Sequence, residues 1–424
     1  MSSTFSALSE RNYRVYAGGA LLSNVGTWFQ NTAQTWLVLQ LTGSGAAVGI
    51  AVALQMLPSL VVSPFAGVLA DRFDKRTWMS WLQIAMAVPA ALVGLLAVTG
   101  VIEVWHVYVL ALVFGTARSF EAPVRQSFVS EMVQPSNLAN AVALNSASFN
   151  SGRLVGPALA GLAIAALGSG ADATGWVILV NAVSYFFVLW ALRALDVAEL
   201  HPSERTRRGE GGVREGLAYV RSRPDLVLLL GTVFFLGAFG LNFQITSALM
   251  ATEEFGKGAG EFGLLGSFVA IGSLTGALIA ARRARPRLRF LVGAALVFCV
   301  VQLVSGLMPT YVAYALTMPL IGITVMTAIT TSNATIQLTT APAMRGRIAA
   351  LYLMVFQGST PLGAPLIGWI AEAQGPRTAL VASGLLAGTG IAGVVLWYVR
   401  QDVGSLRVRL RRRRYDVEVE PEAL

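Results

Sequence analysis

The sequence predicts an all-α membrane protein whose twelve transmembrane helices form two six-helix bundles. Of its 424 residues, 55% are hydrophobic and only 12% are charged, about half the charged fraction usual for a soluble domain. Ten stretches of at least 18 residues contain no charged side chain, and such runs are long enough to cross a bilayer as helices. The cations outside these runs gather in alternate loops, as expected of a chain that crosses the membrane repeatedly.

Turn-forming residues divide the two longest runs into pairs of helices. Gly43 and Gly45 split the first run, and Pro309 splits the run 290–344, because both residue types interrupt helices. Two of the expected helices therefore lie within 290–344. The other ten fall near residues 14–40, 46–70, 77–99, 104–127, 137–167, 174–195, 224–250, 260–281, 348–373 and 377–399.

The distribution of Lys and Arg predicts the orientation of the chain. If the N-terminus is cytoplasmic, 26 of the 31 cations lie in cytoplasmic segments, whereas Lys257 and Arg377 lie outside. We therefore expect a multi-pass protein of the cell (inner or plasma) membrane with both termini in the cytoplasm. The run Arg411 to Arg414 follows the last helix closely, which favours contact with anionic membrane lipid over nucleic-acid binding.

The longest polar stretch divides the chain into two halves. We expect residues 1–195 to form the N-terminal bundle and residues 224–399 to form the C-terminal bundle. Residues 196–223 between them read as a flexible cytoplasmic linker with an amphipathic segment at Val213 to Val220. Residues 400–424 form a basic cytoplasmic tail.

The two halves also repeat each other. Gly156 and Gly161 recur as Gly363 and Gly368 at a constant offset of 207 residues. Gly67 recurs as Gly276 at an offset of 209, and Gly26 recurs as Gly240 at an offset of 214. Any one pair is a weak coincidence among 43 glycines, and the nearly constant offset is what carries weight. Parallel six-helix repeats joined by a linker are typical of transporters whose halves rock about a central cavity.

The segment between the second and third helices contains a charged motif, Gly67, Asp71, Arg72, Lys75 and Arg76. A turn-forming Gly, an Asp at a helix start and a group of cations can act as a latch, whose charge pairs form in one conformation and break in another. A loop that is merely positive would explain the cations but not the spacing from Gly to Asp. The motif resembles the signature loop of the major facilitator superfamily.

A second motif, Gly152, Gly156, Pro157 and Gly161, lies in the fifth helix. It resembles the Gly-Pro motif of antiporters and exporters in the same superfamily. Small residues at this spacing allow helices to approach closely, and Pro157 removes a backbone hydrogen bond, so a packed and bendable helix is expected. Ordinary helix packing gives the same spacing, and the residues alone do not separate the two interpretations.

Three further segments, 120–123, 135–138 and 344–347, resemble the branch of the superfamily that includes the enterobactin (siderophore) exporter and related drug exporters. The resemblance extends over residues 5–400. It implies proton-coupled efflux of a small amphipathic compound by alternating access, with the proton gradient as the energy source and no cofactor.

Glu121 is the acidic residue that we expect inside a span, where a carboxyl group is costly and therefore a functional candidate. Arg118 and Arg125 lie on the same helical face and should keep Glu121 ionised. We therefore favour a partnership between Glu121 and the Arg72 latch over a proton-carrier role. Arg153 lies deep in the fifth helix, where it either faces the cavity and an anionic partner or extends to the membrane surface.

Polar side chains recur at helical spacing on several spans, which predicts a shared substrate cavity. Neutral hydrogen-bonding groups beside aromatic rings suit an amphipathic ligand, and hydrogen bonds between helices would explain the same pattern. The expected cavity residues are Asn24, Trp28, Asn31, Gln34, Asn145, Arg153, Asn242, Thr246, Asn333 and Gln337.

Composition also excludes other classes of protein. Two His residues, one Cys (Cys299) and an isolated intramembrane Glu supply neither a metal site nor a catalytic group, so we do not expect an enzyme. Importers of a nutrient or lysophospholipid, and a non-transporting membrane receptor or scaffold, stay open as alternatives. The expected partners are a small-molecule substrate, protons and membrane lipid, and we expect a monomer.

Overall fold

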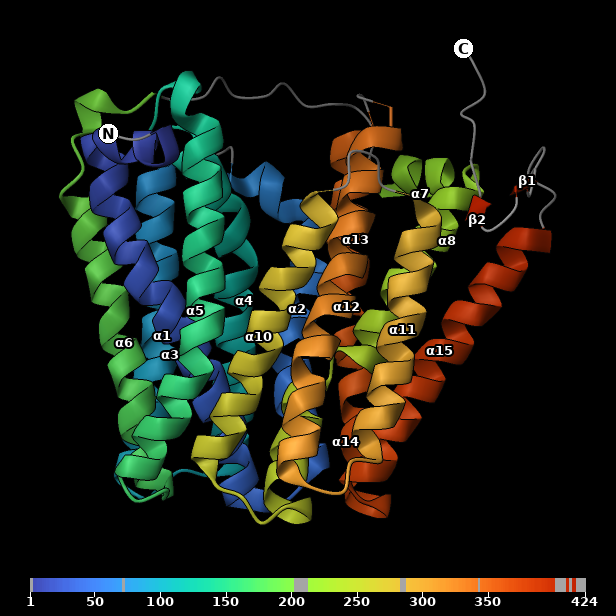
Figure 1. The fold of residues 1–424 in the computed structure, drawn as a ribbon. Helices are drawn as coiled ribbons and strands as arrows, with labels where there is room; N and C mark the ends of the chain where they lie inside the picture. The colour runs from blue at the N-terminus through green and yellow to red at the C-terminus, as the bar shows by residue number, and fades with distance from the viewer. Residues whose placement is uncertain are drawn as a thin grey trace.

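The computed structural model describes residues 3–70, 73–201, 213–282, 287–341, 344–400, 409–411 and 414–416. Within them the chain forms two six-helix bundles that stand side by side (Figure 1). The first bundle contains α1 (Arg11–Thr42), α2 (Gly45–Ala70), α3 (Lys75–Val98), α4 (Val104–Val129), α5 (Leu138–Ala166) and α6 (Ala171–Arg193).

The second bundle also has six spans, two of which are interrupted. Its uninterrupted spans are α10 (Ala259–Ala281), α11 (Leu288–Gly306), α12 (Tyr311–Thr339) and α15 (Pro376–Arg400). The seventh span of the chain joins α8 (Pro224–Phe235) to α9 (Phe243–Leu249), and the eleventh joins α13 (Arg345–Gly358) to α14 (Thr360–Gln374). The predicted twelve-helix fold is confirmed.

Ten spans among the described residues are long and apolar enough to cross a membrane by composition alone. The remaining two, α1 and α5, are 32 and 29 residues long, which also suffices at about 1.5 Å per residue. Their polar side chains make them less hydrophobic than the other spans. These two helices carry six of the ten expected cavity residues.

The seventh span was expected to be one helix over 224–250, and the structure corrects this. A π-helical turn, Leu236–Gly240, separates α8 from α9, and a second, Met250–Glu254, follows α9. The Asn242 side chain donates a hydrogen bond of 2.7 Å to the carbonyl oxygen of Ala238 and so occupies a backbone acceptor at the break. Such π-helical turns occur frequently at functional sites.

The eleventh span was expected to be one helix over 348–373 and is also divided. The break falls at Ser359, immediately before Thr360 and Pro361 begin α14. Pro361 has no backbone N–H to continue the hydrogen-bond ladder of α13, which accounts for the break at this point. Both interrupted spans belong to the second bundle.

Several short elements lie at the same end of the two bundles. Helix α7 (Val213–Arg221), the expected amphipathic segment, lies there together with η1 (Ser3–Ser9) and the end of α15 (Figure 1). Helix α7 packs on α13, where Arg347 forms an ion pair of 3.0 Å with Glu215. We call this the basic end, and the end at which α1 meets α2 the opposite end. The remaining short elements are η2 (Pro135–Asn137), η3 (Val197–Glu199), β1 (Arg409–Arg411) and β2 (Arg414–Asp416).

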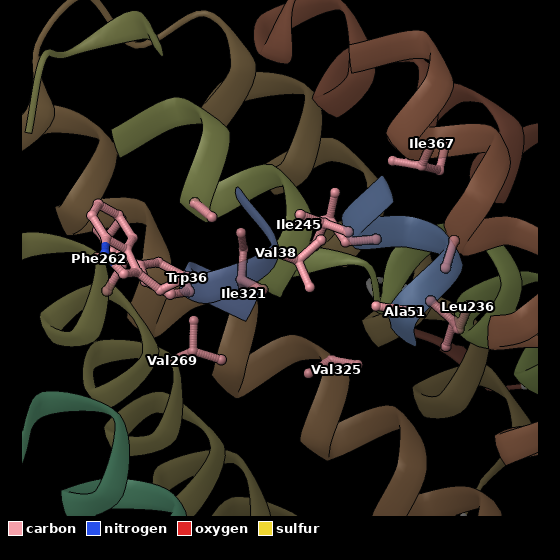
Figure 2. Close-up of a cluster of buried hydrophobic side chains, with 14 of the residues drawn as sticks. Trp36, Val38, Ala51, Leu236, Ile245, Phe262, Val269, Ile321, Val325 and Ile367 are labelled. Carbon is pink, nitrogen blue, oxygen red and sulfur yellow. The ribbon is translucent and has the colours of Figure 1, made fainter. Parts of the chain in front are cut away.

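One apolar cluster of buried side chains continues across both bundles. Figure 2 shows Trp36 of α1 beside Phe262 of α10, with ring centroids 6.0 Å apart and planes inclined by 20°. Val38 of α1 and Ile245 of α9 belong to the same cluster. Because lipid is as apolar as these side chains, close van der Waals contact rather than exclusion from water holds such helices together.

The repeated glycines explain how the bundles approach each other. A methyl group at Gly161 of α5 would overlap the carbonyl oxygen of Ala259 in α10. A methyl group at Gly368 of α14 would likewise overlap the carbonyl oxygen of Gly45 in α2. We call these two contacts, α5 with α10 and α14 with α2, the seam. The sequence repeat at an offset of 207 therefore places equivalent glycines on the two sides of the seam.

The other two glycines at this offset pack within their own bundles. A methyl group at Gly156 would contact the Trp28 side chain of α1, and one at Gly363 would overlap the carbonyl oxygen of Ala238 in the seventh span. In each half, one glycine, Gly156 or Gly363, allows close packing against the first span of the same half. The second glycine, Gly161 or Gly368, allows close packing against the other half.

The seam is closed at the opposite end of the molecule. The Glu372 carboxylate of α14 accepts hydrogen bonds from the Ser44 hydroxyl and, at 3.3 Å, from the Ala46 backbone N–H. Because α2 begins at Gly45, Glu372 caps the N-terminus of a helix that belongs to the other bundle. This contact ties the two bundles together by a charge as well as by packing.

Candidate functional site

A central pocket with about 380 Å³ of empty space lies between the bundles, beside the seam. Both bundles contribute to its wall, so its shape depends on how they are placed relative to each other. Helices α1 and α5 supply one side, and α9 and α10 supply the other. The lining residues are Trp28, Thr32, Arg153, Pro157, Phe243, Gln244, Ser247, Phe262 and Gly266.

Arg153 is the cation of the central pocket. It is partly buried on α5, and the central carbon of its guanidinium group lies 5.6 Å from the centroid of the Trp28 ring. In the part of the chain that the structure describes, Arg153 forms no hydrogen bond and no ion pair. Of the two positions that the sequence left open, the structure places Arg153 at the cavity between the bundles.

The Gly-Pro motif supports both the pocket and the seam. Pro157 lines the pocket and lies against the glycines of α10, Gly263 and Gly266. Gly152, one turn earlier, lies against the backbone of Asn24 in α1. The small residues on α5 thus hold that helix between α1 of its own bundle and α10 of the other bundle.

A second pocket, of about 370 Å³, contains a chain of amide groups. Gln34 of α1 donates to Gln55 of α2 at 3.1 Å, and Gln55 donates to Asn31 at 3.2 Å. Gln244 of the second bundle lines both this amide pocket and the central pocket. The two pockets are therefore neighbours along the same boundary between the bundles.

Gln55 and Gln244 were not among the expected cavity residues. Gln55 is the single amide of the expected helix 46–70, and Gln244 lies two residues after Asn242 in the run 226–252; in an apolar run, amide groups need partners or water. That signal was present in the sequence.

A third pocket, of about 450 Å³, lies within the first bundle, and three partly buried charged residues of α4 line it. Glu121 and Arg125 of α4 form an ion pair of 3.4 Å. Arg125 also donates to the Asn24 side chain at 3.1 Å, and Asn24 donates to Ser148 of α5 at 2.8 Å. Arg118 lines the same pocket, so two guanidinium groups share one carboxylate.

This charged pocket corrects the expected position of Asn24. Its spacing on α1 placed it on one face with Asn31 and Gln34, which suggested a single cavity. The structure instead places Asn24 against α4 and α5 inside the first bundle, whereas Asn31 and Gln34 lie against α2. Helix α1 is long enough for different turns of one face to meet different neighbours.

The charged motif after α2 differs in part from the expected latch. Gly67 lies inside α2, which continues to Ala70, and so it does not form a turn. The residues from Gly67 to Ala70 are apolar and continue the helix because no breaker follows the Gly. Asp71 and Arg72, and with them the expected contact between Arg72 and Glu121, lie outside the described residues.

The two later cations of the motif bind within the first bundle. The buried Lys75 ammonium forms an ion pair with Glu131, which follows α4. Arg76 donates to the carbonyl oxygen of Leu192 at 2.7 Å, near the C-terminus of α6, where a cation is favourable. These contacts fix the start of α3 against its neighbours at the basic end.

The remaining expected cavity residues do not line any of these three pockets. Asn242 and Thr246 are buried and donate to carbonyl oxygens of their own span. Asn145 is partly buried, and Asn333 and Gln337 are exposed in the half of α12 nearer the basic end. The spacing of polar residues along a helix predicted which of them share a face of that helix. It could not predict which neighbouring helix packs against that face.

Comparison with known proteins assigns the class that this architecture defines, a membrane transporter with two six-helix bundles. A model of the transmembrane secretion effector family of the major facilitator superfamily matches residues 2–406, and the chain belongs to this family.

Among curated relatives, the multidrug efflux pump Tap of Mycolicibacterium fortuitum is 27% identical, over 90% of this chain and 95% of Tap. The enterobactin exporter EntS of Shigella boydii is 25% identical, over 89% of this chain and 86% of EntS. Among solved structures, a mutant form of the nucleoside transporter NupG has a TM-score of 0.71 at 12% identity, over 93% of this chain and 99% of NupG. At that identity, the structural likeness concerns the fold alone.

Proposed function

We propose that this protein is a secondary active transporter that exports a small amphipathic compound from the cytoplasm in exchange for protons. The observation that supports this most directly is the central pocket, because its wall is divided between two bundles that can move relative to each other. The efflux pump and the siderophore exporter among the relatives support the direction of transport.

The proposal includes an orientation in which the basic end faces the cytoplasm. Arg11, Arg76, Arg193 and Arg347 lie near this end, and the excess of cations in such segments favours the cytoplasmic side. The seam then closes the pocket from the outside. A molecule in the cytoplasm enters the pocket, the seam opens, and the molecule leaves on the other side.

Transport by purified protein in liposomes tests this function. With an imposed proton gradient, we expect a panel of dyes, siderophores and lipids to include a compound that moves against the direction of proton flow. Collapse of the gradient by an ionophore should abolish that movement. Accumulation in the same direction as proton flow would instead support an importer of a nutrient or lysophospholipid, and no movement of any compound would contradict the proposal.

Glu372→Gln should loosen the opposite end. Loss of the charge that caps α2 costs about 1 kcal/mol, which shifts the balance between closed and open seams roughly fivefold. The readout is a cysteine introduced at Leu249, which packs against Gly45, in a protein whose Cys299 is replaced by Ala. In this background, Glu372→Gln should make the new cysteine react correspondingly faster with a water-soluble maleimide. Glu254→Gln is the matched control, since Glu254 pairs at 2.7 Å with Arg377 in its own bundle. Equal labelling in both variants would show that Glu372 does not close the seam.

A further inference from the structure

The central pocket holds a positive charge without a balancing carboxylate. Its described lining includes Arg153 but no acidic residue. The carboxylate inside the first bundle, Glu121, lies in another pocket and pairs with Arg125. A guanidinium group that is partly removed from water and is not paired with an anion attracts one, because the attraction strengthens as the surroundings become less polar.

The pocket also offers hydrogen-bond donors that need acceptors. The Trp28 Nε1 atom is buried and has no acceptor within the described chain. Indole N–H and guanidinium groups donate and cannot accept. A ligand that satisfies both groups must therefore bring acceptor oxygens, and a ligand with an ammonium group would leave both donors unsatisfied.

Apolar side chains form much of the remaining wall, together with the polar Thr32, Gln244 and Ser247. Trp28 comes from one bundle, and Phe243 and Phe262 come from the other, with Pro157 between them and no side chain at Gly266. Aromatic rings stack well against such walls.

From these three observations we propose that the central pocket binds an organic anion: a flat, apolar or aromatic body with one carboxylate or sulfonate group. Arg153 binds the acid group, the Trp28 indole N–H donates to an acceptor oxygen, and the aromatic rings enclose the body. The ring of Trp28 holds the guanidinium of Arg153 in place while the pocket is empty. This inference rests on the proposed transport function and specifies its substrate class.

Three naphthalene compounds that differ mainly in charge test the proposal: 1-naphthoate, neutral 1-naphthamide and 1-naphthylmethylammonium. Their affinities for the purified full-length protein can be measured by equilibrium dialysis. We expect naphthoate to bind at least tenfold more tightly than the ammonium compound. Arg153→Gln should weaken naphthoate binding about tenfold or more, the typical loss of one charge-assisted hydrogen bond, and change naphthamide binding less than twofold.

Two further variants separate a specific site from a general effect of charge or folding. Arg153→Lys keeps the charge but not the paired donors, so its affinity for naphthoate should lie between those of the wild type and Arg153→Gln. Arg377→Gln, at the opposite end, removes an equal charge and should leave all three affinities unchanged. If Arg153→Gln weakens naphthamide and naphthoate equally, the variant has damaged the pocket and the assigned role of Arg153 is wrong.

The outcomes for binding and transport are distinguishable. A wild type that binds none of the three compounds, or that prefers the ammonium compound, overturns the anion site even if other compounds are transported. A wild type that binds naphthoate through Arg153 but moves no compound across liposomes retains the anion site and contradicts the transport function. Gradient-driven movement of naphthoate that is lost in Arg153→Gln supports both.

Discussion

Gly161→Val is expected to reduce transport at least tenfold. The added side chain would overlap the carbonyl oxygen of Ala259 and the backbone of Gly263 in α10, and neither helix can move aside without separating the seam. Overpacking of this kind costs about 1–3 kcal/mol, enough to shift the closed state about tenfold. Initial rates of transport in liposomes, with equal amounts of folded protein, measure the effect.

Gly393→Val is the matched control for this prediction. Gly393 also lies inside a membrane helix, α15, but a Cβ atom there would contact nothing within 4 Å. Its replacement carries the same helix-propensity change without a clash, so transport should stay within about twofold of the wild type. Equal losses in both variants would show that the seam contact has no special role.

Glu121→Gln is expected to destabilise the protein strongly. The change leaves Arg125 and Arg118 in the charged pocket without their carboxylate, and the loss of one partner from a buried ion pair costs about 3–5 kcal/mol. Thermal unfolding in detergent measures this loss. Glu254→Gln is the control, because its pair with Arg377 is about one-third exposed and such pairs contribute less than about 1 kcal/mol.

The same variant tests whether Glu121 carries the transported proton. Glu121 is already paired with Arg125 in the charged pocket, and it does not line the central pocket. The folded fraction of Glu121→Gln should therefore still move protons when substrate is added, with the same ratio of substrate to protons as the wild type. Loss of proton movement with retained substrate binding would make Glu121 the proton carrier.

The sequence predicted the number and position of the spans because the bilayer imposes a minimum length on every apolar segment. The charge-free runs gave ten of the twelve spans directly, and the predicted boundaries of α2 and α10 differ from the structure by one residue. The glycine repeat was predicted equally well. Glycine allows two helix backbones to come into contact, so Gly161 and Gly368 indicated the seam contacts, which the pattern of polar residues does not reveal.

The interior of the site was predicted less well, because it depends on which helices are neighbours. Asn24 and Asn31 share one face of α1 but contact different helices. Gln244 lines two pockets, whereas Asn242 and Thr246, the residues expected on the same span, line none of the three. The break in the seventh span depends on local competition for backbone hydrogen bonds, which apolar composition does not reveal. The break in the eleventh span follows from Pro361, which the sequence does show.

Reversible locking of the seam tests the central claim that the two bundles move apart at the opposite end during transport. Cysteines at Ser44 and Glu372, whose side chains are in contact, can be joined by a short bis-methanethiosulfonate reagent after Cys299 is replaced by Ala. We predict that the cross-link abolishes transport, that dithiothreitol restores it, and that neither single-cysteine variant responds. Transport at an unchanged rate by fully cross-linked protein would contradict the account.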